Sequence, residues 1–106
     1  MGHFIHSCRR DLDITYIVFN NENYALTTGQ ASPTTPIGAV TKTTPSGNTT
    51  LPFDPVELAK HAGCSFATHA IDTKFADLKE TIKAAIQHKG FSLVDVGQAC
   101  PSYKRW

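Results

Sequence analysis

The chain has 106 residues, a formal net charge of +1 at neutral pH and 18% charged residues. This length allows one domain at most, and the near-neutral charge gives no electrostatic case for binding nucleic acid or an anionic membrane. No apolar run is long enough to cross a bilayer, and the first residues lack the apolar core of a signal peptide. Cys8, Cys64 and Cys100 are widely spaced and do not form a disulfide framework, which indicates a reducing, cytoplasmic location.

Residues 1–11 have the pattern of an amphipathic helix. Phe4, Ile5 and Cys8 recur at about one helical turn, and two arginines follow in the last turn, where the helix dipole favours cations. No N-cap residue precedes the apolar stripe. We therefore expect the chain to open inside a helix and to be part of a larger fold.

Residues 14–19 form a run of β-branched and aromatic side chains. Such a run predicts a strand buried on both faces, as in a parallel sheet covered by helices. After Asn20, residues 21–52 show neither a helical nor a strand period, and long irregular loops are usually functional. The apolar residues expected to anchor this loop are Tyr24, Leu26, Ile37, Val40 and Leu51. We predict an ordered, functional loop at the carboxyl end of the strand, where open α/β sheets bind ligands.

The second half of the chain alternates helices and strands. Asp54 as N-cap, Pro55 at the first helical position and Glu57 in a capping box predict a helix that ends at Gly63. A strand is expected within residues 64–71, and residues 91–96 form the last one.

A longer helix is predicted between these two strands, capped by Asp72 or Thr73 and ended by Gly90. Its buried face is predicted to consist of Phe75, Leu78, Ile82, Ala85 and Ile86. Strands separated by helices at this rhythm imply right-handed crossovers. The predicted fold class is therefore α/β, with a parallel sheet and flanking helices.

Four sequence motifs follow one another along the chain. From Asn20 the chain reads N-N-E-N-Y-A-L-T-T-G-Q-A-S-P-T-T-P, followed by D-P-V-E-L-A, by H-K-G-F-S-L-V-D-V and by C-P. Together they resemble the β subunit of 2-oxoacid:ferredoxin oxidoreductases, the family that includes pyruvate synthase and its 2-oxoglutarate relatives. The resemblance extends over nearly the whole chain. It implies that residues 1–106 are a partial thiamine diphosphate (TPP)-binding domain, the later half of that fold, without the upstream G-D-G strand and the cluster cysteines.

The resemblance also implies cofactor-binding residues. Asn21 would bind Mg²⁺ through its side chain and Asn23 through its carbonyl, since this ion takes oxygen ligands. The residues implied to contact TPP are Asn21, Asn23, Tyr24, Leu26, Thr27, Gly29 and Gln30. From the residues alone, turn chemistry for the asparagines and core packing for Tyr24 and Leu26 are the alternatives. Many relatives have Gly or Lys at the position of Thr28, and pyruvate enzymes often have Asn at that of Leu26. The departure at Leu26 counts against pyruvate specificity, and the implied substrate is pyruvate or 2-oxoglutarate.

Cys100 is implied to ligate a [4Fe-4S] cluster, together with three cysteines far upstream, because such clusters take four thiolates. The alternative from the residue alone is a free structural cysteine. Cys8 and Cys64 are expected to pack as small buried side chains.

The implied reaction is the oxidative decarboxylation of a 2-oxoacid to an acyl-CoA, with electrons passed to ferredoxin. The implied partners are the α subunit (in some complexes also γ and δ), ferredoxin, coenzyme A and the 2-oxoacid. No catalytic acid or base is assigned, and the isolated chain is expected to be inactive. Two alternatives stay open: an acetolactate-synthase-like TPP decarboxylase without iron–sulfur clusters, and a non-catalytic remnant or binding module of the same fold.

Overall fold

The structure is a computed structural model that describes residues 2–24 and 26–98. It divides into two compact units, which are described separately. The sheet unit comprises Met1–Phe19 and Pro55–Gly97, and the loop unit comprises Asn20–Asp54 and Gln98–Trp106. Among the described residues, no helix is long and apolar enough to span a membrane.

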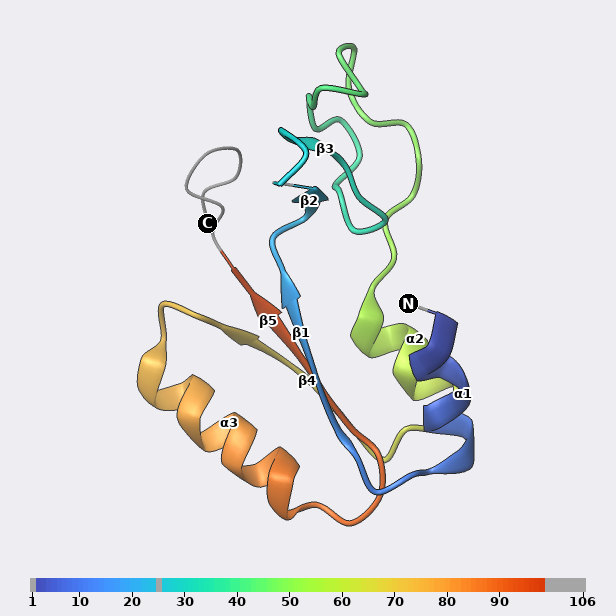
Figure 1. Cartoon of the computed structure of the whole chain (residues 1–106), viewed down its shortest axis with the longest axis vertical. Helices are drawn as coiled ribbons and strands as arrows, with labels where there is room; N and C mark the ends of the chain where they lie inside the picture. The colour runs from blue at the N-terminus through green and yellow to red at the C-terminus, as the bar shows by residue number, and fades with distance from the viewer. Residues whose placement is uncertain (1, 25, 99–106) are drawn as a thin grey trace. The chain divides into compact units, whose positions relative to one another are not determined.

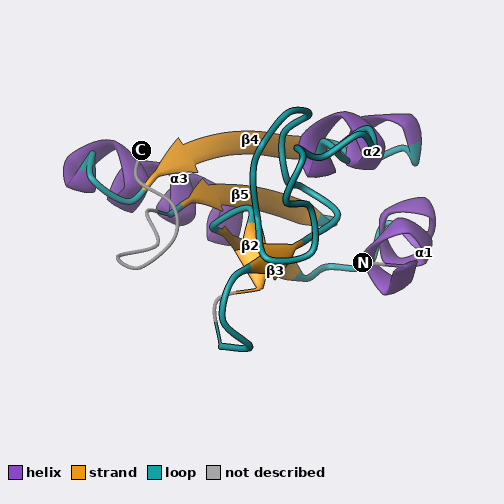
Figure 2. Cartoon of the chain, turned by 90° about the horizontal axis from the view of Figure 1, so that it is seen from above, coloured by secondary structure: helices purple, strands orange, loops and turns teal. Residues whose placement is uncertain are grey.

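The sheet unit contains three helices and three strands. In chain order they are α1 (Gly2–Arg10), β1 (Thr15–Asn20), α2 (Pro55–His61), β4 (Phe66–Ile71), α3 (Phe75–Gln87) and β5 (Ser92–Gly97). The strands form a parallel sheet in the order β1-β5-β4 (Figure 1). β4 lies beside β5 (Figure 2), with a register that runs from Phe66 opposite Ser92 to Ile71 opposite Gly97. The predicted α/β class with a parallel sheet is confirmed.

Side chains of β5, and of Phe91 just before it, alternate between two separate apolar cores. Phe91 and Leu93 pack with Phe4, Cys8 and Ala59 on the face covered by α1 and α2. On the other face, where α3 lies (Figure 1), Val94 and Val96 pack with Ala85. A strand with helices on both faces is buried at every position, and this explains why every residue from 91 to 96 is buried, including the polar Ser92 and Asp95.

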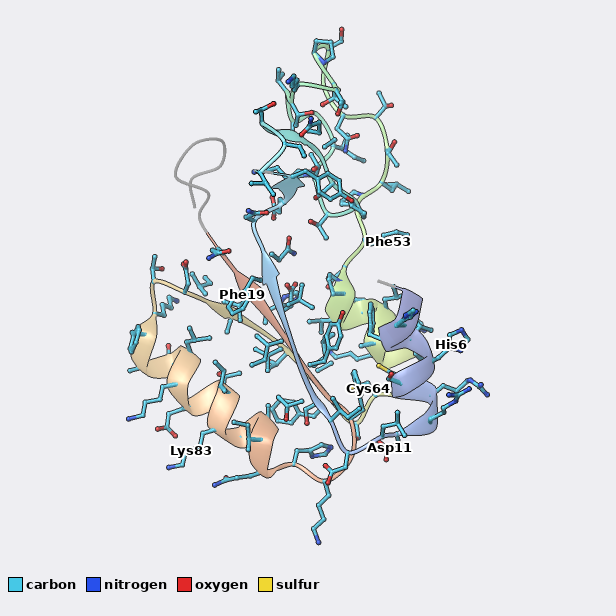
Figure 3. The ribbon with its side chains drawn as sticks, in the orientation of Figure 1. His6, Asp11, Phe19, Phe53, Cys64 and Lys83 are labelled. Carbon is cyan, nitrogen blue, oxygen red and sulfur yellow. The ribbon has the colours of Figure 1, made fainter. Side chains whose placement is uncertain are left out.

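The prediction that the strand at residues 14–19 is buried on both faces is wrong. β1 lies at an edge of the described sheet, and the Phe19 side chain is 70% exposed (Figure 3). The central strand is β5, where even Ser92 and Asp95 are buried. Ser92 satisfies its hydroxyl by donating to the carbonyl of Ala85 at 2.9 Å, and this makes its burial tolerable. Position in the sheet decides burial here, more than the apolar content of the strand.

The helix ends agree only in part with the predictions. α2 begins at Pro55 as predicted, and Gly63, with a φ of 96°, turns the chain after the helix ends. The N-cap of α3 is Lys74, which makes no side-chain capping bond, so the prediction of Asp72 or Thr73 is wrong. α3 ends at Gln87, ahead of Gly90, whose φ of 106° serves the turn into β5.

The predicted buried face of α3 is correct for Ala85, and Leu78 and Ile82 are half-buried. It is wrong for Phe75 and Ile86, which are 78% and 66% exposed. Ile86 follows the buried Ala85 by one residue and therefore points about 100° away from it around the helix. Phe75 is the first residue of α3, one turn before Leu78 reaches the core.

The loop unit contains a short hairpin that was not predicted. β2 (Asn23–Tyr24) pairs antiparallel with β3 (Gln30–Ala31). Strands of two residues are too short to produce a period-2 pattern, so this hairpin leaves no signal in the sequence.

The rest of the loop unit is held by polar side chains. Asn48 is buried and its Nδ2 donates to the carbonyls of Thr35 and Thr50, each at 3.0 Å, and to that of Pro36 at 3.3 Å. Thr35, 1% exposed, is buried as well. The apolar residues that were predicted to anchor the loop are exposed instead: Tyr24, Leu26, Ile37, Val40 and Leu51. The segment is a hydrogen-bonded structure, and apolar anchoring does not account for its order.

Candidate functional site

The site begins with the turn that follows β1. The Asn20 Oδ1 accepts hydrogen bonds from the Glu22 backbone N–H at 3.1 Å and from the Thr34 hydroxyl at 2.8 Å. Glu22 has a φ of 62°, and its carbonyl accepts the Thr35 hydroxyl at 2.6 Å. Asn20 therefore shapes the turn, and its carboxamide oxygen is fully used in doing so.

The side-chain oxygens of Asn21 and Asn23 accept fewer hydrogen bonds than that of Asn20. The Asn21 Oδ1 accepts the Asn23 backbone N–H at 3.4 Å, a long distance for this type of bond. The Asn23 Nδ2 donates to the Asn21 carbonyl at 3.2 Å, while the Asn23 Oδ1 is buried and has no hydrogen-bond partner in the described part of the chain. A buried acceptor without a donor is costly unless something else satisfies it. This donor set of amide oxygens fits a hard cation such as Mg²⁺.

The hairpin after this turn holds the remaining predicted cofactor residues. The Gly29 backbone N–H donates to the Tyr24 carbonyl at 2.9 Å, and Gly29 itself is buried with a φ of 100°. The Thr27 hydroxyl donates to the Gln30 Oε1 at 2.6 Å across the turn. Tyr24 and Leu26 are 52% and 98% exposed, so the alternative that they pack in a core is wrong. All seven predicted cofactor residues thus lie within one short segment, residues 21–30.

A pocket of about 350 Å³ opens beside this hairpin. Its lining consists of Glu22, Asn23, Thr28, Gly29, Thr35, Pro36, Ala39, Val40, Thr41 and Lys42. Asn23 and Gly29 were predicted from the sequence, whereas Lys42 was missed. The Lys42 Nζ donates to the Thr28 Oγ1 at 2.7 Å, a contact across fourteen residues of irregular chain that no local pattern signals.

The cysteines separate into two cases. Cys100 lies outside the described residues. Cys8 is buried and Cys64 is half-buried beside α1 and α2 (Figure 3). Burial raises the pKa of the Cys8 thiol to about 12, and the neighbouring Cys64 adds to the rise through its charge and a hydrogen bond. The prediction of a small packed side chain is confirmed for Cys8, and Cys64 packs at the margin of the same core.

Comparison with known proteins finds a matching family model and several similar proteins. Residues 1–96 match the family model described as thiamine pyrophosphate enzyme, C-terminal TPP binding domain. The 2-oxoglutarate synthase subunit KorB of Archaeoglobus fulgidus is 47% identical over 104 residues, which cover 98% of this chain and 39% of that protein. The 2-oxoglutarate oxidoreductase subunit KorB of Mycobacterium tuberculosis is 46% identical over 102 residues, 96% of this chain and 27% of that protein.

A third relative and a solved structure are also similar to this chain over nearly its whole length. The 2-oxoacid:ferredoxin oxidoreductase subunit beta of Saccharolobus solfataricus is 45% identical over 103 residues, 97% of this chain and 34% of that protein. The 2-oxoglutarate:ferredoxin oxidoreductase from Magnetococcus marinus, solved with 2-oxoglutarate, coenzyme A and succinyl-CoA bound, superposes with a TM-score of 0.93 at 34% identity. That match covers 98% of this chain and 36% of the other. The chain therefore spans between 27% and 39% of the length of these relatives.

Proposed function

The chain belongs to the thiamine pyrophosphate enzyme family, as its match to the C-terminal TPP-binding domain shows, and from this membership we propose that it is a cofactor-binding part of the β subunit of a 2-oxoacid:ferredoxin oxidoreductase. The complete enzyme oxidatively decarboxylates a 2-oxoacid to an acyl-CoA and passes the electrons to ferredoxin. The observation that carries this proposal is the match to subunits of such enzymes, with alignments that cover at least 96% of the chain.

Asn21 and Asn23 are the proposed Mg²⁺-binding residues. Asn21 offers a carboxamide oxygen that is held only by a bond of 3.4 Å, and Asn23 offers its main-chain carbonyl. The Asn23 Oδ1 lies in the same turn and accepts no hydrogen bond from the described residues. Mg²⁺ needs few protein oxygens when diphosphate oxygens complete its octahedron.

The hairpin supplies the remaining contacts with TPP, which when bound contributes an electron sink for the keto carbon of the substrate. The exposed Leu26 and Tyr24 offer apolar and aromatic surface to the rings of the cofactor. Gly29 lets the main chain approach closely, and the bond between Thr27 and Gln30 fixes the turn that presents these groups.

The other proposed parts of the enzyme involve groups beyond the described residues. Cys100 is proposed as one thiolate ligand of a [4Fe-4S] cluster. Cys8 and Cys64, which pack in and beside the core of the sheet unit, are not proposed as ligands. The proposed partners are the α subunit, ferredoxin, coenzyme A and the 2-oxoacid.

The test is a reduction assay with the purified complex that contains this chain. With TPP, Mg²⁺ and coenzyme A present, we expect reduction of ferredoxin or a viologen dye that depends on a 2-oxoacid and yields acyl-CoA. Decarboxylation without reduction of the acceptor would instead identify an acetolactate-synthase-like enzyme. TPP binding without turnover of any 2-oxoacid would identify a non-catalytic module, and either result would refute the proposed activity.

A further inference from the structure

Two thiols of the sheet unit lie in contact with each other. Cys8 belongs to α1, and Cys64 follows the turn after α2, where its backbone N–H donates to the Ala59 carbonyl at 3.0 Å. Both cysteines are free, and their side chains are joined by a hydrogen bond. Cys64 lies beside α1 (Figure 3). The proposed function uses neither thiol, so their pairing calls for a separate explanation.

The hydrogen bond between the two thiols runs from Cys8 to Cys64. The Cys64 Sγ donates to the Phe66 carbonyl at 2.9 Å, and the Phe91 carbonyl lies within its reach at 3.4 Å. Because a thiol has a single proton, the Cys64 sulfur is left to accept the proton of Cys8. Burial raises the pKa of the Cys8 thiol to about 12, and Cys64 adds to the rise, as expected for a proton that Cys8 donates.

The two thiols differ in their access to solvent. Cys64 is half-buried, so a small oxidant can reach its sulfur, whereas Cys8 is 1% exposed and is shielded. Oxidation of cysteine begins at the accessible sulfur and gives a sulfenic acid, which condenses with a neighbouring thiol to form a disulfide. A sulfenic acid on Cys64 would have the Cys8 thiol already in contact with it. The geometry therefore makes Cys64 the attacking thiol and Cys8 the resolving one.

The surroundings of the pair favour redox chemistry over metal binding. A structural zinc site needs four ligands of the cysteine, histidine or carboxylate type. Among residues 2–24 and 26–98, no group of three such side chains placed for a metal ion includes Cys8 or Cys64. Both cysteines instead pack in and against the apolar cluster of Phe4, Ala59 and Phe91, which supplies no further ligand.

We propose that Cys8 and Cys64 are a redox pair, which hydrogen peroxide converts into a disulfide between α1 and the segment that leads into β4. The Cys64 sulfur attacks one peroxide oxygen, the O–O bond breaks, and the departing hydroxide takes the thiol proton and leaves as water. The Cys8 sulfur then attacks the sulfenic sulfur of Cys64, the S–O bond breaks, and that hydroxide leaves with the Cys8 proton as a second water. The two thiols lose two electrons, and the peroxide gains them. An added dithiol such as dithiothreitol reverses the oxidation by thiol–disulfide exchange.

The disulfide would close a covalent loop that contains the proposed cofactor segment. Residues 9–63 lie between the two cysteines in the sequence and include Asn20–Asp54 of the loop unit. A cross-link of this kind restricts the unfolded chain and so stabilises the folded one. It also removes the proton that Cys64 donates to the Phe66 carbonyl at the start of β4. Oxidation is therefore expected to change both the stability of the chain and the amide signals near Phe66.

The first measurement is peptide mapping by mass spectrometry after treatment with hydrogen peroxide, applied to the full chain and to the purified complex that contains it. We expect a cross-link between Cys8 and Cys64 that dithiothreitol removes, in wild type and, for the full chain, equally in Cys100→Ser. Cys64→Ser is the matched variant, because serine keeps a donor for the Phe66 carbonyl, and its Cys8 should stay unoxidised. In either sample, sulfinic acid on Cys64 without the cross-link, a cross-link to Cys100 instead, or no oxidation would overturn the proposal.

The second measurement is urea unfolding of the full chain before and after oxidation. The disulfide is expected to raise the midpoint on the order of 1–2 M, and dithiothreitol should restore the reduced value. Peroxide should leave the midpoint of Cys64→Ser unchanged, and a cooperative transition of the untreated variant establishes that it is folded. A cross-linked chain whose midpoint does not rise would refute the stabilising role. Neither measurement depends on turnover of a 2-oxoacid, so the outcome is independent of the proposed function.

Discussion

The Asp11 carboxylate occupies the space into which a side chain on Gly90 would project. Its Oδ1 lies 2.6 Å from the position of a Cβ on residue 90, and the same oxygen accepts the backbone N–H of Phe91 at 3.0 Å. Asp13 accepts the N–H of Gly90 at 3.3 Å. These bonds join the segment after α1 to the start of the central strand β5, across about eighty residues of sequence.

Gly90→Ala is therefore expected to destabilise the sheet unit by about 2–3 kcal/mol. The alanine would have to adopt a φ of 106° and would displace Asp11 from its bond with Phe91. Urea unfolding measures the change.

Gly63→Ala is the matched control for this prediction. Gly63 has a similar φ of 96°, but a Cβ there would meet nothing within 4 Å. Its cost is expected to be about 1 kcal/mol, since only the backbone conformation is disfavoured. Adding Asp11→Ala to Gly90→Ala should bring the cost of the glycine substitution down toward the Gly63 value. Equal costs for the two single glycine variants would contradict the steric part of the argument.

Asn48→Ala is expected to open the loop unit while the sheet unit stays folded. Asn48 is buried, and its removal leaves the carbonyls of Thr35, Pro36 and Thr50 without their shared donor. Unsatisfied buried carbonyls make the expected cost about 2–3 kcal/mol. Hydrogen exchange at residues 35–50 measures the opening, and the exposed neighbour Thr49→Ala serves as the control. Protection equal to wild type in Asn48→Ala would show that Asn48 does not organise the loop.

Asn20→Ala and Asn21→Ala are expected to have different effects. The Asn20 oxygen is used by Glu22 and Thr34, so its loss should disorder the turn and increase proteolysis of the loop. Asn21→Ala should leave proteolysis unchanged but raise the Mg²⁺ concentration needed for TPP binding by the complex, by about tenfold or more. Identical phenotypes for the two variants would mean that Asn21 is structural.

Stability is expected to fall in alkaline solution through Cys8. Its pKa is raised from 9.0 to about 12, mainly by burial. Below about pH 9 the thiol is neutral in both states, whereas between about pH 9 and 12 only the unfolded chain ionises at this position, and folding weakens as the pH rises. The urea midpoint of wild type should therefore decline more steeply above about pH 9 than that of Cys8→Ala. Parallel declines would contradict the assigned pKa.

The sequence predicted the kind and approximate place of the helices and longer strands, because each carries its own local signal. Asp54-Pro55 marked the start of α2, and the apolar run ahead of Val96 marked β5. The order of the strands carries no such signal. The run at residues 14–19 is more apolar than β5, which contains Ser92 and Asp95, yet β5 is the buried central strand.

The candidate site likewise contains residues that the sequence predicted and one, Lys42, that it did not. The motif in residues 20–30 gathered the proposed cofactor residues in one segment, since they are nearly consecutive, but it did not predict the hairpin that they form. Lys42 contacts Thr28 from a turn in which the hydroxyls of Thr41, Thr43 and Thr44 make hydrogen bonds. Side-chain bonds of this kind depend on three-dimensional closure, and a threonine-rich string predicts only a loop.

The polar interior of the loop unit has a thermal consequence. This unit covers Thr35 and Asn48 while Ile37, Val40 and Leu51 face solvent, so melting it should expose little additional hydrocarbon. Its contribution to the heat capacity increment should accordingly be small. Cooling weakens assemblies that depend on hydrophobic contact, such as the two cores around β5, but should spare the threonine- and asparagine-bonded loop. On cooling from room temperature to near freezing, the loop unit should thus lose less stability than the sheet unit.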